Sequence, residues 1–192
     1  MSNKNKVKFG LKNGVVWPIS EIGPDGKITY GEAIKMPGSV SLSFSPEESS
    51  EPFYADDIVY YLSQASTGYS GDWELALVPD DFRTKIMGER IDDNGVLVEA
   101  TDDRRKEFAY AFEMEGDVHA RKFLFPRCAA GRIPIEGETK AEANKPKTET
   151  MKLTAMGRMD NNITKVVADP ESTAYKDWYN KPYEPTFSAS GT

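Results

Sequence analysis

Apolar residues recur at every second position over much of this chain, and this period constrains the fold more than any other feature. In the run 106–115 the alternating positions are large and apolar: Phe108, Tyr110, Phe112 and Met114. Similar alternation occurs in the runs 27–36, 39–45 and 69–78, and further candidates lie at 122–133 and 148–158. Because successive side chains of a strand point to opposite faces, the pattern predicts half-buried β-strands.

Turn-forming residues separate these runs. Pro24-Asp25-Gly26 and Asp93-Asn94-Gly95 each join two strand candidates in the manner of a hairpin, and Pro37-Gly38 breaks a third pair. Six to nine strands with short connections favour antiparallel neighbours. The predicted fold is therefore mainly β, an antiparallel β-sandwich or small barrel with long loops.

One helix is expected to flank this sheet, at about 80–87. Asp80 and Asp81 suit its first turn, Phe82 and Ile86 share a face, and Gly88 suits its end. A second, shorter helix is expected near 172–179.

Length and charge narrow the function. The 192 residues suit a single domain, 1–192, and 39% of them are hydrophobic, so a sizeable core is expected. The formal net charge is −7, which repels phosphate and argues against a tight nucleic-acid binder. There is no apolar run long enough to span a bilayer, so no membrane partner is expected.

The sequence gives little indication of a catalytic site. Cys128 and His119 are the only residues of their types, and nine positions separate them. On one strand that is about 30 Å, with the side chains on opposite faces. Ser70 misses the G-x-S-x-G spacing, and the acidic turn at 92–95 misses the EF-hand spacing. We expect no enzyme, no catalytic residue, no metal site and no cofactor.

Four segments are predicted to be arms or loops. They are an N-terminal arm at 1–6, a long loop or arm at 45–66, a charged loop at 136–147 and a C-terminal tail at 181–192. Aromatic residues crowd the second of these: Phe53, Tyr54, Tyr60 and Tyr61 lie outside the alternating runs, and Tyr69 lies just beyond the arm, at the start of the run 69–78. They either pack back on their own subunit or form a protein–protein interface, where tyrosine is common.

Several short strings, in this order along residues 5 to 183, give the chain a family likeness. They include Lys6-Val7-Lys8-Phe9-Gly10-Leu11-Lys12-Asn13, Pro37-Gly38-Ser39-Val40-Ser41-Leu42-Ser43, Pro52-Phe53-Tyr54-Ala55-Asp56, Gly68-Tyr69-Ser70-Gly71-Asp72, Pro79-Asp80-Asp81-Phe82-Arg83 and Trp178-Tyr179. In these strings the chain resembles the major tail protein, or tail tube protein, of long non-contractile-tailed phages of Gram-positive hosts.

The resemblance implies a virion structural protein. Such proteins have a β-sandwich or small barrel of the tail-tube type and form rings, usually hexameric, that stack into the tail tube. Genomic DNA passes through the lumen only transiently and without specific binding. The implied partners are the chain itself and the tape-measure, tail-initiator and tail-terminator proteins, and the implied location is the virion, after assembly in the host cytoplasm.

By the same likeness, the arm at 45–66 is the candidate for ring-to-ring stacking. The candidate interface residues either lie in the arm or carry an aromatic ring close to it. They are Pro52, Phe53, Tyr54, Asp56, Tyr60, Tyr61 and Tyr69. The alternative function is a monomeric β-sandwich module that binds a ligand or carbohydrate through exposed tyrosine and tryptophan.

Overall fold

The computed structural model describes residues 5–137 and 146–187 of the chain. It is mainly β, with 51% of residues in strands and 6% in helices. The strands are β1 (Lys8–Ile22), β2 (Ile28–Tyr30), β3 (Ile34–Met36), β4 (Ser39–Ala55), β5 (Ile58–Leu75), β6 (Arg90–Ile91), β7 (Leu97–Val98), β8 (Phe108–Gly116), β9 (Arg121–Ala130), β10 (Glu149–Met156) and β11 (Val166–Ala168). The helical turns are α1 (Asp80–Phe82), η1 (Arg83–Met87) and η2 (Thr173–Tyr175).

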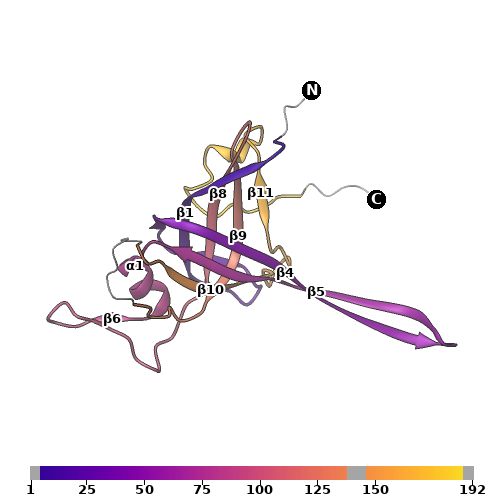
Figure 1. Cartoon of the computed structure of the whole chain (residues 1–192), viewed down its shortest axis with the longest axis horizontal. Coiled ribbons are helices and arrows are strands. Elements are labelled where there is room, and N and C mark those ends of the chain that lie inside the picture. The colour runs from indigo at the N-terminus through magenta and orange to yellow at the C-terminus, as the bar shows by residue number, and fades with distance from the viewer. Residues whose placement is uncertain (1–4, 138–145, 188–192) are drawn as a thin grey trace.

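Nine of the strands form one antiparallel sheet, in the order β2-β1-β8-β9-β10-β5-β4, with β3 added to β1 and β11 added to β9. Strand β9 has two successive neighbours: residues 122–124 pair with β11, and residues 128–130 pair with β10. The sheet therefore bends along β9. In Figure 1, β4 and β5 therefore run across β8 and β9 rather than beside them. The predicted antiparallel sandwich or small barrel is confirmed.

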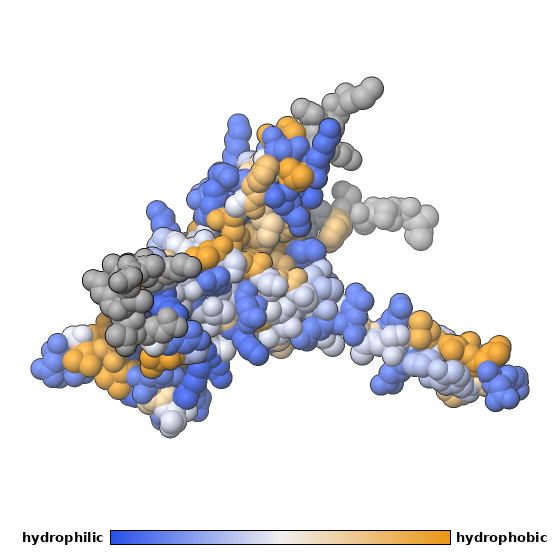
Figure 2. All heavy atoms as spheres, in the orientation of Figure 1, coloured by the Kyte–Doolittle hydropathy of each residue, from blue (hydrophilic) through white to orange (hydrophobic). Residues whose placement is uncertain are grey.

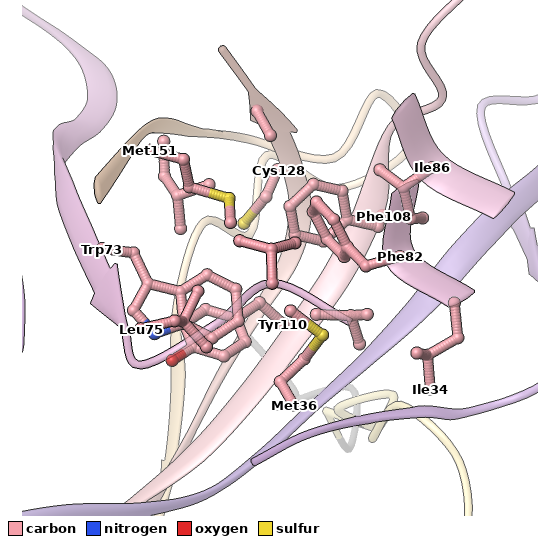
Figure 3. Close-up of a cluster of buried hydrophobic side chains, with 14 of the residues drawn as sticks. Ile34, Met36, Trp73, Leu75, Phe82, Ile86, Phe108, Tyr110, Cys128 and Met151 are labelled. Carbon is pink, nitrogen blue, oxygen red and sulfur yellow. The ribbon is translucent and has the colours of Figure 1, made fainter. Parts of the chain in front are cut away.

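The main core lies between the two parts of this folded sheet (Figure 3). The predicted alternating face of β8 is buried here, together with Trp73 and Leu75 of β5 and Met151 of β10. The Trp73 ring lies 4.3 Å from that of Tyr110, centroid to centroid. Burial of several large side chains in one cluster supplies the main stabilisation of the fold.

The predicted helix closes one end of this core. α1 and η1 together span residues 80–87, and Phe82 and Ile86 are both fully buried. Gly88 follows with a φ of +88°, a left-handed conformation that glycine adopts without the strain other residues incur. The second predicted helix is a single turn, η2.

A second core covers the opposite face of β1, β8 and β9. Val15, Trp17, Ala109 and Ala111 lie there, beneath Trp178 from the C-terminal segment. Because β8 is buried on both faces, its small residues are as inaccessible as its large ones. The alternating pattern predicts only the first of these two faces.

The predicted C-terminal tail needs a correction, because its first part is packed rather than loose. Pro182 is buried, and Tyr183 stacks on Trp178 with ring centroids 5.7 Å apart. Arg158, itself buried, donates to Glu184 at 3.3 Å and so ties this segment to the loop after β10. Residues 188–192 lie outside the described part, as do 1–4 of the N-terminal arm and 138–145 of the charged loop.

The two predicted hairpin turns are confirmed. Residues 23–27 join β1 to β2, and residues 92–96 join β6 to β7 in a separate two-stranded sheet. No helix in residues 5–137 or 146–187 combines the length and apolarity needed to cross a membrane.

Candidate assembly surface

The most prominent feature of the molecule is a two-stranded ribbon formed by the outer parts of β4 and β5 (Figure 1). The sequence predicts a loop or arm at 45–66, but this segment is antiparallel strand, paired from Glu47↔Gly68 out to Ala55↔Ile58 with register shifts at Glu47/Glu48 and Phe53/Tyr54. Pro46 and Pro52 argue against a strand, yet β4 lies at the edge of the sheet, where a missing N–H leaves no partner unsatisfied.

The ribbon leaves the body at Gly68. This residue forms the last pair of β5 with β10, so the outer part of β5 has only β4 as a neighbour. Gly68 has a φ of +140°, and a Cβ there would lie 2.0 Å from the carbonyl oxygen of Ala155. Thr67, left unpaired by a bulge opposite Glu47 and Glu48, bends the ribbon at the same place.

Asp56 and Asp57 form the turn at the far end. Their φ angles are +51° and +59°, as in the two-residue turn that suits the twist of a hairpin. Aspartate tolerates this left-handed conformation better than most residues. The turn is therefore tight, and it places two carboxylates at the tip.

The ribbon has a polar stem and an apolar head. In the stem, residues 48–51 pair with 63–66, and the side chains are small or charged except for the amide of Gln64. The head comprises residues 52–55 and 58–62. Its large side chains are exposed by 46% (Leu62) to 70% (Tyr60): Phe53, Tyr54, Ile58, Val59, Tyr60, Tyr61 and Leu62. Figure 2 shows apolar atoms gathered near the end of the ribbon, with polar atoms at the tip.

Both faces of the head are apolar. Directly opposed residues of paired strands project from the same face. Phe53 opposite Tyr61 therefore occupies one face, and Tyr54 opposite Val59 the other. A two-stranded ribbon with neither face covered is marginally stable in water, so this head is suited to contact with another surface.

Six of the seven predicted interface residues lie on the head or its turn: Pro52, Phe53, Tyr54, Asp56, Tyr60 and Tyr61. Tyr69 does not. It is half-buried in the body, where its ring meets Phe125 edge-on at 5.5 Å and Lys165 donates to its hydroxyl at 2.9 Å. Tyr69 thus lies at the edge of the core, away from the head, and its part in an interface stays a prediction.

Sequence reasoning missed three of the large side chains of the head: Ile58, Val59 and Leu62. They adjoin Tyr60 and Tyr61 in an unbroken apolar run of five residues, Ile58–Leu62. A buried strand gives the same signal, so exposure could not be inferred from it.

The ribbon is also strongly acidic. No lysine, arginine or histidine occurs between Lys35 and Arg83. Within residues 46–66 the carboxylates are Glu47, Glu48, Glu51, Asp56 and Asp57, which together carry a formal charge of −5 out of the chain's −7. A complementary surface would therefore be apolar with basic residues around it.

The lone cysteine and histidine lie in different settings. Cys128 is completely buried, and burial raises the pKa of its thiol well above the ordinary range. The imidazole of His119 is partly exposed and lies 3.6 Å from a carboxylate oxygen of Asp169. Across the described ranges, no cluster of three or more histidine, cysteine, aspartate or glutamate residues could hold a metal ion.

Comparison with known proteins adds no assignment. No protein-family model matches the chain, and no curated protein matches it either. The fold and the ribbon are therefore the basis for a functional proposal.

Proposed function

We propose that this protein is a virion structural subunit that assembles into rings, which stack to form the tail tube of a long-tailed phage and a conduit for its DNA. The observation that carries the proposal is the ribbon, whose apolar head projects from the body without cover on either face. An exposed cluster of aromatic and aliphatic side chains of this kind is typical of a protein–protein contact.

The sheet order provides a second line of support. β4, a strand of 17 residues, ends the order on one side, and the three-residue β2 ends it on the other. An open edge of this length presents unpaired backbone groups to which another strand can add. Contacts of two different surfaces, repeated around an axis, close into a ring, whereas the same kind of contact along an axis remains open-ended.

The acidic character is compatible with a conduit. With six subunits per ring, the formal charge would be 6 × −7 = −42 per ring. An acidic lumen repels the phosphates of DNA, which favours passage over binding.

The alternative, a monomeric carbohydrate-binding module, has less support. All three tryptophans, Trp17, Trp73 and Trp178, are buried by 98% or more, so none is available to stack on a sugar. The exposed tyrosines lie on a projecting ribbon rather than in a concave site.

The proposal is tested by removing the ribbon without disturbing the body. Replacement of residues 49–65 by Asn-Gly keeps the Glu48↔Ser66 pair and closes it with a favoured two-residue turn. We expect the wild-type chain to form hollow tubes or stacked annuli in negative-stain electron microscopy as its concentration rises. The shortened variant should remain folded by circular dichroism and should not stack.

Two outcomes would count against the proposal. Tubes of normal length from the shortened variant would remove the ribbon from the mechanism. A wild-type chain that stays monomeric at high concentration, even with a tail-initiator complex present, would contradict assembly itself.

A further inference from the structure

A groove with a basic rim lies where the N-terminal end of β1 meets β8 and β9. We call it the N-terminal groove and define it by Lys6, Val7, Lys8, Met114, Arg121 and Phe123. In one copy of the chain it lies well away from the head of the ribbon, near the end of the molecule labelled N in Figure 1.

The wall of this groove is held in place by hydrogen bonds. The side chain of Asn5 accepts from the backbone N–H groups of Val118 and His119, at 3.1 and 3.0 Å, and donates to the carbonyl of His119 at 2.7 Å. The carboxylate of Asp117 accepts from the backbone N–H of Lys6 at 2.8 Å. The chain at 5–7 is therefore fixed against the β8–β9 turn, which prepares the groove for binding.

The floor of the groove is apolar. Phe123 is partly buried and stacks on Phe112 with ring centroids 5.2 Å apart. Met114 is also partly buried, and Val7 is 49% exposed. The main core thus continues to the surface at this point, and a bound aromatic side chain would extend it.

The rim of the groove carries positive charges, of which some are not in ion pairs. Within the described ranges, the ammonium groups of Lys6 and Lys8 form no ion pair, whereas Arg121 pairs with Asp169 at 2.8 Å. Of the two carboxylates at the groove, Glu115 is paired with Lys12, and Asp117 accepts hydrogen bonds from the backbone N–H groups of Lys6 and Val7. The groove therefore offers two lysines to an acidic ligand.

We propose that the N-terminal groove of one copy receives the head of the ribbon of a second copy. The aromatic side chains of the head pack on Phe123, Met114 and Val7, and the carboxylates of the turn, Asp56 and Asp57, pair with Lys6 and Lys8. This inference rests on the proposed self-assembly, and it names the surface to which the ribbon binds. The contact joins two different surfaces, so it can repeat along a polymer without limit.

Cross-linking tests the contact directly. Cys128 is buried and its thiol is protonated at neutral pH, so it does not compete with introduced cysteines. The variant Val7→Cys/Tyr60→Cys, treated with a short bismaleimide under assembly conditions, should give a ladder of covalent oligomers. The matched control Ile91→Cys/Tyr60→Cys places its second cysteine on β6, at a position of similar exposure outside the groove, and should give none.

Charge reversal tests the rim. We expect Lys6→Glu/Lys8→Glu to raise the concentration needed for assembly by about tenfold or more, since tenfold corresponds to 1.4 kcal/mol. Adding Asp56→Asn/Asp57→Asn should restore part of the loss, because asparagine keeps the left-handed turn and removes the repulsion. Lys35→Glu/Lys152→Glu changes the net charge equally at exposed positions outside the groove and serves as control.

The outcomes separate this inference from the proposed function. A ladder from the control pair but not from the Val7 pair, in a chain that forms tubes, would overturn the groove and leave self-assembly standing. Equal effects of the two lysine reversals would also overturn it. Failure of the wild-type chain to assemble under any condition would remove both.

Discussion

Strand β5 passes through two environments, and their comparison separates backbone pairing from side-chain burial. From Gly68 to Leu75 it lies between β10 and β4, and Trp73 and Leu75 are fully buried. From Ile58 to Thr67 it pairs with β4 alone, and every side chain is exposed. Hydrogen-bonded pairing thus fixes the geometry of both regions, but only the inner region contributes the apolar burial that stabilises the subunit. The outer region has apolar surface that only a partner can bury.

The largest expected change in stability comes from a substitution in the inner region of β5. Trp73→Ala removes a fully buried indole that packs on Tyr110 and Phe82, and it should lower the free energy of unfolding by about 4 kcal/mol. Urea unfolding followed by circular dichroism measures this. Loss of less than about 1 kcal/mol would show that the inner region is not the main source of stability.

The next largest loss of stability is expected when one methyl group is added within the same strand. A Cβ at Gly71 would lie 1.5 Å from the carbonyl oxygen of Ser43, so β4 and β5 could not keep their spacing. Gly71→Ala should therefore cost about 3 kcal/mol in the same unfolding experiment. Ser70→Ala, at the neighbouring half-buried position, should change stability by less than about 0.5 kcal/mol. Equal costs for the two variants would argue against a steric cause.

A change in the outer region should show the opposite behaviour. Tyr60→Ser/Tyr61→Ser removes two rings that are 70% and 65% exposed, so unfolding of the isolated subunit should change by less than about 1 kcal/mol. If these rings are interface anchors, each contact loses about 2 kcal/mol, and the concentration needed for assembly rises roughly thirtyfold. Sedimentation velocity over a concentration series measures this. If the variant subunit were destabilised while assembly stayed unchanged, the two rings would stabilise the subunit rather than the interface, which contradicts this prediction.

The smallest expected effect concerns the wall of the N-terminal groove. Hydrogen bonds from the backbone N–H groups of Lys6 and Val7 hold the pKa of Asp117 below its ordinary value of 3.8. Because the folded-state pKa is lowered, this stabilisation is complete above pH 3.8 and is lost as the pH falls through the folded-state value. The amide resonances of Lys6 and Val7 should follow that titration in nuclear magnetic resonance spectra. Asp117→Asn should abolish the titration, and its persistence in that variant would assign it to another group.

The sequence predicted strands in which large apolar residues alternate with small or polar ones, even where both faces are buried, as in β8. Phe108, Tyr110 and Phe112 alternate with smaller residues, and the main core lies where this alternation places it. For β1 the turn at 24–26 predicted only that a strand precedes it, because the central residues Val15–Trp17 are large on both faces and show no period of two.

The site was predicted in part, for a physical reason. The aromatic cluster indicated that the segment is an interface candidate. The prolines and serines of 45–52 have low strand propensity, so the segment was predicted as a loop or arm rather than as paired strands. Tyr69 was grouped with Tyr60 because they are close in sequence, yet nine residues of strand separate them by about 30 Å. The N-terminal groove depends on contacts between 5–8 and 114–123, which no local pattern reports.

The absence of basic residues between Lys35 and Arg83 also determines which proteases can act on the ribbon. Trypsin, which cleaves after lysine and arginine, has no site anywhere along the ribbon, although its side chains are exposed. Chymotrypsin has candidate sites at Phe53, Tyr54, Tyr60 and Tyr61, all on the head. The ribbon of a free subunit should therefore survive one enzyme and be cut by the other, and protection from chymotrypsin should appear only when another surface covers those rings.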